Sequence, residues 1–416
     1  MKYPFNPTIL TGLVREYSTP LWVYDAEHIR SVISELSQFD VVRYAQKACS
    51  NTHILTLMRE AGVCVDSVSL GEIRRAQKAG FSEKADASGA AGIVFTADIF
   101  DRATLDCVVR ENIEVNVGSI DMLDQLGVVS PHHRVWLRIN PGFGHGHSKK
   151  TNTGGENSKH GIWHTQLPEA LARIRDHRLH LVGLHLHIGS GVDYTHLERV
   201  CHAMADIVSQ VDCDFEAISA GGGLSVSYRE GDCRIDTRHY FCLWDEVRKN
   251  AEQRLAHPVR LEIEPGRFLV AESAVLLAEI RATKQMGQNH FTLIDAGFND
   301  LMRPALYGSY HEISLIPGDG RDLSRQSPIP TVVAGPLCES GDVFTQALDG
   351  TVETRNLPPA SVGDIAVFHN AGAYGASMSS NYNSRTHAAE YLIDGKSSRL
   401  IRRRQNIEEL LALEDL

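Results

Sequence analysis

VCVDSVSLGEIRRAQKAG, residues Val63 to Gly80, contains the pattern that decides the fold. Its first part, Val63–Ser67, is short and rich in valine, which is typical of a buried β-strand. Leu70–Ala79 then has the apolar spacing of an amphipathic helix, and Gly80 stands where helices commonly end. The stretch therefore predicts one β/α unit.

The same alternation recurs from Leu21 to about Val270. Other strand-like runs are Val41–Ala45, Ile93–Thr96, Glu114–Val117, Val135–Ile139, Leu181–Ile188, Ala217–Ala220 and Val259–Glu264. Helical patterns lie between most of them, as at Met122–Leu126, Pro168–His177 and Leu197–Val211. About eight such units is the count of a closed (β/α)8 barrel of the TIM type. An open doubly wound sheet gives the same local pattern, and periodicity alone does not separate the two.

The chain changes character after Val270. The strand-like runs Phe291–Ile294, Pro330–Ala334 and Asp364–His369 are separated by turns and not by helices. We expect residues 21–270 to form the barrel domain. We expect residues 1–20 together with 271–416 to form a second domain, mostly a β-barrel.

Composition limits the function classes. The chain has 416 residues, 43% of them hydrophobic, which is enough to bury large cores. A formal net charge of -11 argues against a broad nucleic-acid or anionic-membrane surface. The first residues lack the pattern of a secretion signal, and the 8 cysteines form no C-x-x-C pair. These features predict a cytosolic protein with reduced thiols.

Polar side chains stand where the predicted strands end. Active sites of such barrels lie at the carboxyl ends of the strands, so these residues are site candidates. They are Lys47, Asp66, Ser67, Ser69, Asn116, Arg138, Asn140, His185, His187, Gly221–Gly223 and Glu264.

Lys47 follows an apolar strand. A lysine that loses solvation there gives up its proton more easily, which favours a Schiff base with an aldehyde cofactor. Glu264 could hold a proton on a pyridine nitrogen, and Arg267 could pair with a phosphate or carboxylate. Taken alone, Lys47 is better explained as an ordinary exposed lysine. Glu264 and Arg267 are also compatible with a strand end that carries a surface ion pair.

Three glycines, Gly221–Gly223, could ring a phosphate with backbone N–H groups or could simply form a tight turn. His185 and His187 lie on one face of a strand, but a third ligand at suitable spacing is missing, so no metal site is expected. Cys338 begins a turn with two carboxylates, Cys338–Asp342, where a thiol could donate a proton. The long stretch Gly142–Lys159 is typical of a functional loop such as a lid.

Together these motifs resemble, in order and over nearly the whole chain, the barrel-type pyridoxal-phosphate decarboxylases of alanine racemase-like fold. Tyr44–Ala48 is similar to the family's cofactor-lysine motif, and Asp66–Glu72 to its next strand end. The remaining matches are His185–Gly191, Gly221–Gly223, Glu264–Arg267, Arg303–Tyr307, Cys338–Asp342 and Gly372–Tyr374. Two positions depart from the pattern: Gly191 where many members have Gln, and Asn370 where many have Asp. Related ornithine decarboxylases also carry Asn at the second position.

The resemblance implies a cofactor, pyridoxal 5'-phosphate (PLP), bound covalently to Lys47. His187 would stack on its ring and Glu264 would keep its nitrogen protonated. The resemblance also implies cofactor contacts from Asp66, Ser190, Gly221, Gly222, Gly223, Gly266, Arg267 and Tyr374. Cys338 would return a proton after carbon dioxide has left.

The branch that it resembles most acts on meso-diaminopimelate and makes lysine. The resemblance implies that the substrate contacts are Arg267, Arg303, Tyr307, Glu339 and Tyr374. It also implies a homodimer with active sites shared between the two copies.

Three alternatives stay open at this point. A decarboxylase for ornithine, arginine or carboxynorspermidine would need less positive charge at the far end of its substrate than Arg303 and Tyr307 offer. An alanine-racemase-like enzyme would place an arginine near the pyridine nitrogen, where this chain has Glu264. A non-catalytic homologue would tend to lose Lys47 or Cys338.

Overall fold

The structure is a computed structural model that describes residues 5–85, 88–144, 153–187, 189 and 194–415. It divides into two compact units. The barrel unit consists of Arg30–Val226 and Cys233–Leu269. The sheet unit consists of the residues up to Ile29, Ser227–Asp232 and the chain from Val270 onwards. Within the described part of the chain, no helix combines the length and apolar character needed to cross a membrane.

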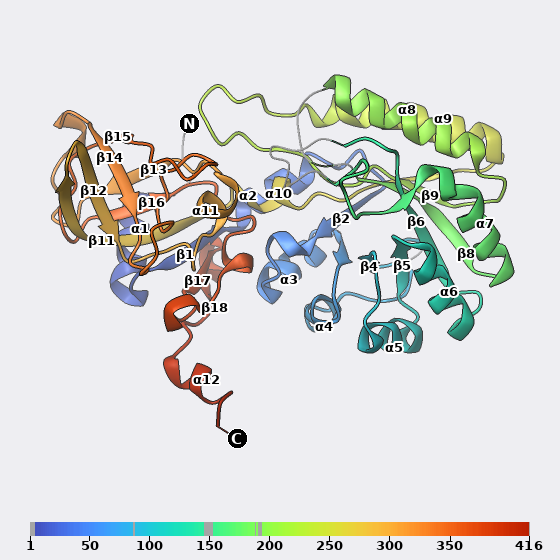
Figure 1. Ribbon diagram of the computed structural model, residues 1–416, viewed down its shortest axis with the longest axis horizontal. Coiled ribbons are helices and arrows are strands. Elements are labelled where there is room, and N and C mark those ends of the chain that lie inside the picture. The colour runs from blue at the N-terminus through green and yellow to red at the C-terminus, as the bar shows by residue number, and fades with distance from the viewer. Residues whose placement is uncertain (1–4, 86–87, 145–152, 188, 190–193, 416) are drawn as a thin grey trace. The chain divides into compact units, whose positions relative to one another are not determined.

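The barrel unit contains a closed ring of parallel strands, and Figure 1 shows helices on both sides of these strands. Around the ring the order is β2-β3-β4-β5-β6-β8-β9-β10, and the ring closes because β10 pairs with β2 and β5 pairs with β6. The expected TIM-like barrel is therefore confirmed, and the alternative of an open sheet is excluded. The strands are β2 (Val41–Ala45), β3 (Cys64–Ser67), β4 (Ile93–Ala97), β5 (Glu114–Val117), β6 (Arg134–Asn140), β8 (His180–Leu186), β9 (Ala217–Ser219) and β10 (Arg260–Ile263), with a short β7 (Ile162–Trp163) beside β6.

Helices connect the barrel strands, and several of them begin at residues whose side chains accept a backbone N–H of the first turn. Ser69 accepts the N–H of Glu72 at the start of α4, and Asp101 accepts that of Thr104 at the start of α5. Gly80 follows α4 with a φ of 88°, as expected of a helix-ending glycine. The helices are α2 (Ala26–Ser34), α3 (Thr52–Glu60), α4 (Leu70–Lys78), α5 (Arg102–Glu111), α6 (Ile120–Val129), α7 (Leu167–Asp176), α8 (Tyr194–Gln210), α9 (Thr237–Leu255) and α10 (Arg267–Val270).

A chain of ion pairs crosses the amino-terminal end of the barrel. Arg43 binds Glu262 at 2.8 Å, and each side chain is only 1% exposed. Arg134 binds Glu216 at 2.9 Å and Glu114 at 2.6 Å. These charges are compensated within the protein, so this end of the barrel supports stability and the carboxyl end remains for chemistry.

The sheet unit is built on a mixed sheet in the order β15-β14-β12-β11-β1-β17-β18, and β16 pairs with both β11 and β13. Its strands are β1 (Leu21–Asp25), β11 (Ala274–Met286), β12 (Asn289–Ile294), β13 (Ile313–Ile316), β14 (Ile329–Ala334), β15 (Arg355–Leu357), β16 (Ile365–Phe368), β17 (Ala389–Ile393) and β18 (Arg399–Arg402). Its helices are α1 (Pro7–Tyr17), α11 (Arg303–Tyr307) and α12 (Ile407–Leu411). The expectation of a mostly β second domain is confirmed.

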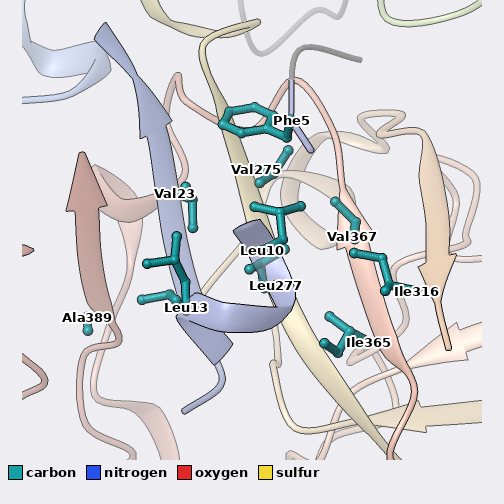
Figure 2. Packing of buried hydrophobic residues seen from close by; sticks show 11 residues of the cluster. Phe5, Leu10, Leu13, Val23, Val275, Leu277, Ile316, Ile365, Val367 and Ala389 are labelled. Atoms are coloured by element: carbon teal, nitrogen blue, oxygen red, sulfur yellow. The ribbon is translucent and has the colours of Figure 1, made fainter. Parts of the chain in front are cut away.

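One face of this sheet is covered by α1. Figure 2 shows Leu10 and Leu13 of α1 among Val23, Val275 and other apolar side chains of the strands. Burying each aliphatic side chain of this size contributes roughly 1.5–3 kcal/mol. The cluster therefore fixes the amino-terminal segment to strands far away in the sequence.

The structure moves one boundary. The expected barrel domain, residues 21–270, includes Leu21–Asp25, but this stretch is β1 of the sheet unit. It pairs antiparallel with β11 and parallel with β17, and both partners lie after Val270. The barrel unit accordingly begins at Arg30 and not at Leu21.

Candidate active site

Lys47 lies in a one-turn helix, η1 (Gln46–Ala48), directly after β2. The expected loss of solvation is wrong, because η1 buries Gln46 and Ala48 and leaves the Lys47 side chain exposed. Its charge still reaches the barrel interior. Burial raises the pKa of the Asp66 and Glu72 carboxyls, and the positive charge of Lys47 opposes that rise in both. The amine of Lys47 is therefore near two acids.

Glu264 follows β10 and is held by a buried histidine. His185 Nε2 donates to Glu264 Oε2 at 2.7 Å, and the Ser219 hydroxyl donates to Oε1 at 3.3 Å. Burial alone would raise the pKa of Glu264, but the charge and hydrogen bond of His185, with Arg43, hold it well below its usual range. Glu264 is therefore a carboxylate at neutral pH, as the partner of a protonated pyridine nitrogen must be.

Asp66 is the residue before last in β3 and is only 4% exposed. Burial and then the charge of Glu264 raise the pKa of Asp66 above its usual range. Its Oδ1 atom is buried and has no hydrogen-bond partner. A buried acceptor of this kind costs free energy unless a bound group supplies the missing donor.

His187 is held on two sides just after β8. The backbone N–H of Gly222 donates to its Nδ1 at 3.2 Å, and the Thr153 hydroxyl donates to its carbonyl oxygen at 3.1 Å. Because Nδ1 accepts, it carries no proton, and burial lowers the pKa of the ring well below its usual range. His187 is therefore neutral, a form that can stack on an aromatic ring without adding charge.

The glycine loop after β9 leaves no room for side chains. A Cβ added at Gly221 would lie 2.1 Å from the Leu186 carbonyl oxygen, and one at Gly222 would lie 2.3 Å from that of Glu264. Gly221 also has a φ of 60°. The loop can therefore present only backbone to a ligand, which suits the binding of a phosphate.

Asn140 has a different role from the one its strand-end position suggested. Its amide donates to the carbonyls of Gly155 and His160 and accepts the N–H groups of Gly142 and Gly155. Asp98, at the end of β4, accepts from His160 Nδ1 at 2.7 Å. Asn140 therefore ties the start of the Gly142–Lys159 loop to its later part, and Asp98 holds the residue that follows the loop. The middle of the loop, residues 145–152, lies outside the described part of the chain.

Cys338 lies in the sheet unit, in an exposed turn after β14. The turn is built on Asp342, which is only 3% exposed and accepts the N–H groups of Phe298 and Leu337 at 2.7 and 2.8 Å. The N–H of Cys338 itself donates to Asn383 Oδ1 at 3.0 Å. Its backbone is thus fixed while its thiol remains accessible.

Arg303 and Tyr307 are the two ends of α11. Arg303 is only 4% exposed and donates through Nη1 to Tyr228 Oη at 3.1 Å and to His311 Nε2 at 3.0 Å. Tyr307 is half-buried. A buried guanidinium at the start of this helix is well suited to a carboxylate ligand.

The remaining candidates divide between the two units. Gly266 is buried and Arg267 half-buried at the start of α10, in the barrel unit. Glu339 is exposed beside Cys338 and Tyr374 is half-buried, both in the sheet unit. Ser190 lies outside the described residues.

Comparison with known proteins identifies the family of this chain. The model of "Pyridoxal-dependent decarboxylase, pyridoxal binding domain" matches residues 26–271. The chain belongs to the pyridoxal-dependent decarboxylases. Its cofactor is PLP, and it is a carboxy-lyase. The matched residues include the whole closed barrel.

Similar proteins extend the likeness over both units. The chain is 64% identical to the diaminopimelate decarboxylase of Escherichia coli over 405 residues, 97% of this chain and 96% of that protein. It is 60% identical to that of Streptomyces coelicolor, over 97% and 91% of the two chains.

Solved structures agree with these relatives. A crystal structure of diaminopimelate decarboxylase with 62% identity matches with a TM-score of 0.96 over 100% of this chain and 98% of that one. The Helicobacter pylori enzyme complexed with L-lysine matches at 30% identity and a TM-score of 0.86, over 98% and 99% of the two chains.

The residues of the barrel unit fit PLP. Glu264 would offer an anion to the pyridine nitrogen, and the side-chain-free loop at Gly221 and Gly222 would offer backbone to the phosphate. Lys47 would offer an accessible amine to the aldehyde. The missing partner of Asp66 Oδ1 is a further sign that the interior is incomplete without a bound polar group.

Proposed function

We propose that this decarboxylase converts meso-2,6-diaminopimelate to L-lysine and carbon dioxide, the last step of lysine biosynthesis. The observation that carries the proposal is the 64% identity to a diaminopimelate decarboxylase over 97% of the chain. Loss of one carboxylate from this diamino diacid gives a diamino monoacid, so the enzyme must retain the distal end of the substrate while it releases carbon dioxide.

The barrel residues would hold and tune the cofactor. When bound, PLP acts as an electron sink for the electron pair left by the departing carboxylate. Lys47 would hold its aldehyde carbon, and the carboxylate of Glu264 would keep a proton on the pyridine nitrogen. The neutral His187 ring would cover one face of the cofactor and exclude water from it.

The sheet-unit residues would handle the substrate. Arg303 would pair with the distal carboxylate, and Glu339 would attract the distal ammonium group. Cys338 would donate its thiol proton to the carbon that has lost carbon dioxide, which completes a new C–H bond. Arg267, Tyr307 and Tyr374 are proposed as further contacts to the substrate.

The test is a carbon-dioxide release assay on a panel of amino acids, with and without PLP. We expect equimolar carbon dioxide and L-lysine from meso-diaminopimelate, only in the presence of PLP. Comparable release from ornithine, arginine or carboxynorspermidine would replace the substrate assignment and would leave a decarboxylase of another specificity.

We also propose that the enzyme is a homodimer with shared sites and acts in the cytoplasm, where its eight free cysteines would stay reduced. Lys47 belongs to the barrel unit and Cys338 to the sheet unit. If each site combines Lys47 of one copy with Cys338 of the other, two differently inactivated copies can repair one another.

Mixing Lys47→Ala with Cys338→Ala under conditions of subunit exchange tests the sharing. About half of the dimers would be mixed and each would hold one intact site, so activity should return to about a quarter of wild type. No recovery, with exchange shown independently, would place each site within one chain.

A further inference from the structure

Arg303 is held by two neutral side chains of the sheet unit. Its Nη1 donates to both Tyr228 Oη and His311 Nε2. The centre of its guanidinium also lies 5.0 Å from the centroid of the Tyr228 ring, and the Tyr228 and His311 rings meet edge to face at 5.6 Å. Neither partner carries negative charge, so these contacts orient the guanidinium without neutralising it.

The tautomer of His311 follows from its two partners. Its Nδ1 lies 3.0 Å from the carbonyl oxygen of His369, which can only accept, so Nδ1 carries the proton. Its Nε2 faces an N–H of Arg303, which can only donate, so Nε2 is unprotonated. His311 is therefore a neutral link between Arg303 and the backbone at the end of β16.

Tyr228 reaches this place on a short excursion of the chain. Ser227–Asp232 lies between β9 and α9 in the sequence, yet it belongs to the sheet unit. Within the excursion the carboxylate of Asp232 accepts the N–H of Tyr228 at 2.9 Å and that of Arg229 at 2.8 Å. The backbone that carries Tyr228 is thus a defined turn.

Asn370 attaches the excursion to the sheet unit. Its Nδ2 donates to the Ser227 carbonyl oxygen at 2.8 Å, and its own backbone has a φ of 53°, which asparagine tolerates better than most residues. This is the position where many members of the family have Asp. A carboxylate could not donate this bond and would face a carbonyl oxygen instead.

We propose that Tyr228 and His311 are positioning residues that set the orientation of Arg303, and that Asn370 secures Tyr228 for this task. The proposal rests on the proposed function, because it makes the trio the determinant of selectivity for a substrate with a distal carboxylate. A displaced Arg303 would still carry its charge but would meet that carboxylate in a poorer geometry. The loss would therefore appear in substrate binding and not in the chemistry of bond cleavage.

The test uses two conservative variants, Tyr228→Phe and Asn370→Asp, in the PLP-loaded enzyme. Tyr228→Phe keeps the ring beside Arg303 and removes the hydroxyl group that accepts from Arg303 Nη1. Each variant should raise KM for meso-diaminopimelate about tenfold with kcat within about twofold of wild type. The preference for diaminopimelate over ornithine should fall by a similar factor.

Two matched controls belong in the same unit. Asn356→Asp changes an exposed asparagine on β15, and Tyr17→Phe changes a half-buried tyrosine on α1. Both should leave KM, kcat and the preference unchanged.

The outcomes separate the two proposals. A wild-type enzyme without activity on meso-diaminopimelate would overturn the proposed function. An active wild-type enzyme with unchanged KM and preference in both variants would overturn only the positioning role. So would a fall in kcat at constant KM, or a fall in Tm without a change in selectivity, because a merely structural role predicts those results.

Discussion

His185 Nε2 lies 2.7 Å from Glu264 Oε2, and both side chains are almost enclosed by the barrel. The pair explains how a largely buried carboxylate stays charged just after β10. The two histidines on either side of Leu186, whose spacing alone suggested an incomplete metal site, have separate partners. His185 at the end region of β8 binds Glu264, and His187 just after β8 accepts the N–H of Gly222.

Removing this donor should weaken cofactor binding. In His185→Phe, the histidine no longer counteracts the effect of burial on Glu264, so the pKa of Glu264 should rise. A protonated Glu264 cannot pair with a pyridinium. We expect PLP affinity of the apoprotein to fall about tenfold at pH 6 and less at pH 8, measured by absorbance titration. His180→Phe, at the other end of β8, is the control. Equal affinities for wild type and His185→Phe at pH 6 would disprove the role.

Glu72 should make the apoprotein less stable as pH rises. Burial raises its pKa to about 7, against the opposing hydrogen bond from the N–H of Val68. An acid with a raised pKa in the folded state binds more protons folded than unfolded, so stability is lost as pH rises through that value. Glu72→Gln should remove this loss. Its free energy of unfolding relative to wild type should therefore be about 1–2 kcal/mol higher at pH 8 than at pH 5. Urea titrations of both forms, with exposed Glu60→Gln as control, measure it; a pH-independent difference would refute it.

The ion pair at the other end of the barrel should matter for stability alone. Arg43→Met leaves Glu262 buried with its main partner removed, which should cost about 3–5 kcal/mol of unfolding free energy. Arg325→Met breaks the exposed pair with Asp322, 87% and 53% exposed, and should cost less than about 1 kcal/mol. Similar losses in the two variants would show that the barrel pair is not protected from solvent.

Cys338 should be needed for turnover but not for cofactor binding. Cys338→Ala should retain the turn, because Asp342 accepts the N–H of Leu337 and Asn383 accepts the N–H of Cys338, and neither bond involves the thiol. We expect kcat to fall about 100-fold or more with unchanged PLP affinity. The exposed Cys233→Ala is the control. Normal turnover in Cys338→Ala would remove the thiol from the reaction.

The barrel strands were predictable because most are short runs rich in Val, Ile and Leu, and some are followed by a residue that caps the next helix. Val41–Ala45 and Glu114–Val117 agree residue for residue with β2 and β5. The strand β1 was not assigned correctly, because its partners Ala274–Leu277 and Ala389–Ile393 lie hundreds of residues away. Composition identifies a strand but does not identify the sheet that it joins.

The sequence predicted which residues form the candidate site better than it predicted their burial and their hydrogen-bond partners. The spacing of strand ends brought Asp66, His187 and Glu264 into one set, but not the exposed position of Lys47. Tyr228 has its role because Ser227–Asp232 joins the sheet unit, and Asn140 has its role because it binds residues near both ends of the Gly142–Lys159 loop. Those are tertiary features that no local pattern records. The departure at Asn370 was visible in the sequence, and only the Ser227 carbonyl beside it gives that departure a physical reason.

Every step proposed for the site depends on Lys47 carrying the cofactor. Reduction of the PLP-loaded enzyme with borohydride, followed by proteolysis and mass spectrometry, locates the linkage directly. We expect one pyridoxyl group per chain on the peptide that contains Lys47, and none on Lys47→Ala treated in the same way. A label on any other lysine of the wild-type enzyme, or an equally labelled Lys47→Ala, would contradict the assignment.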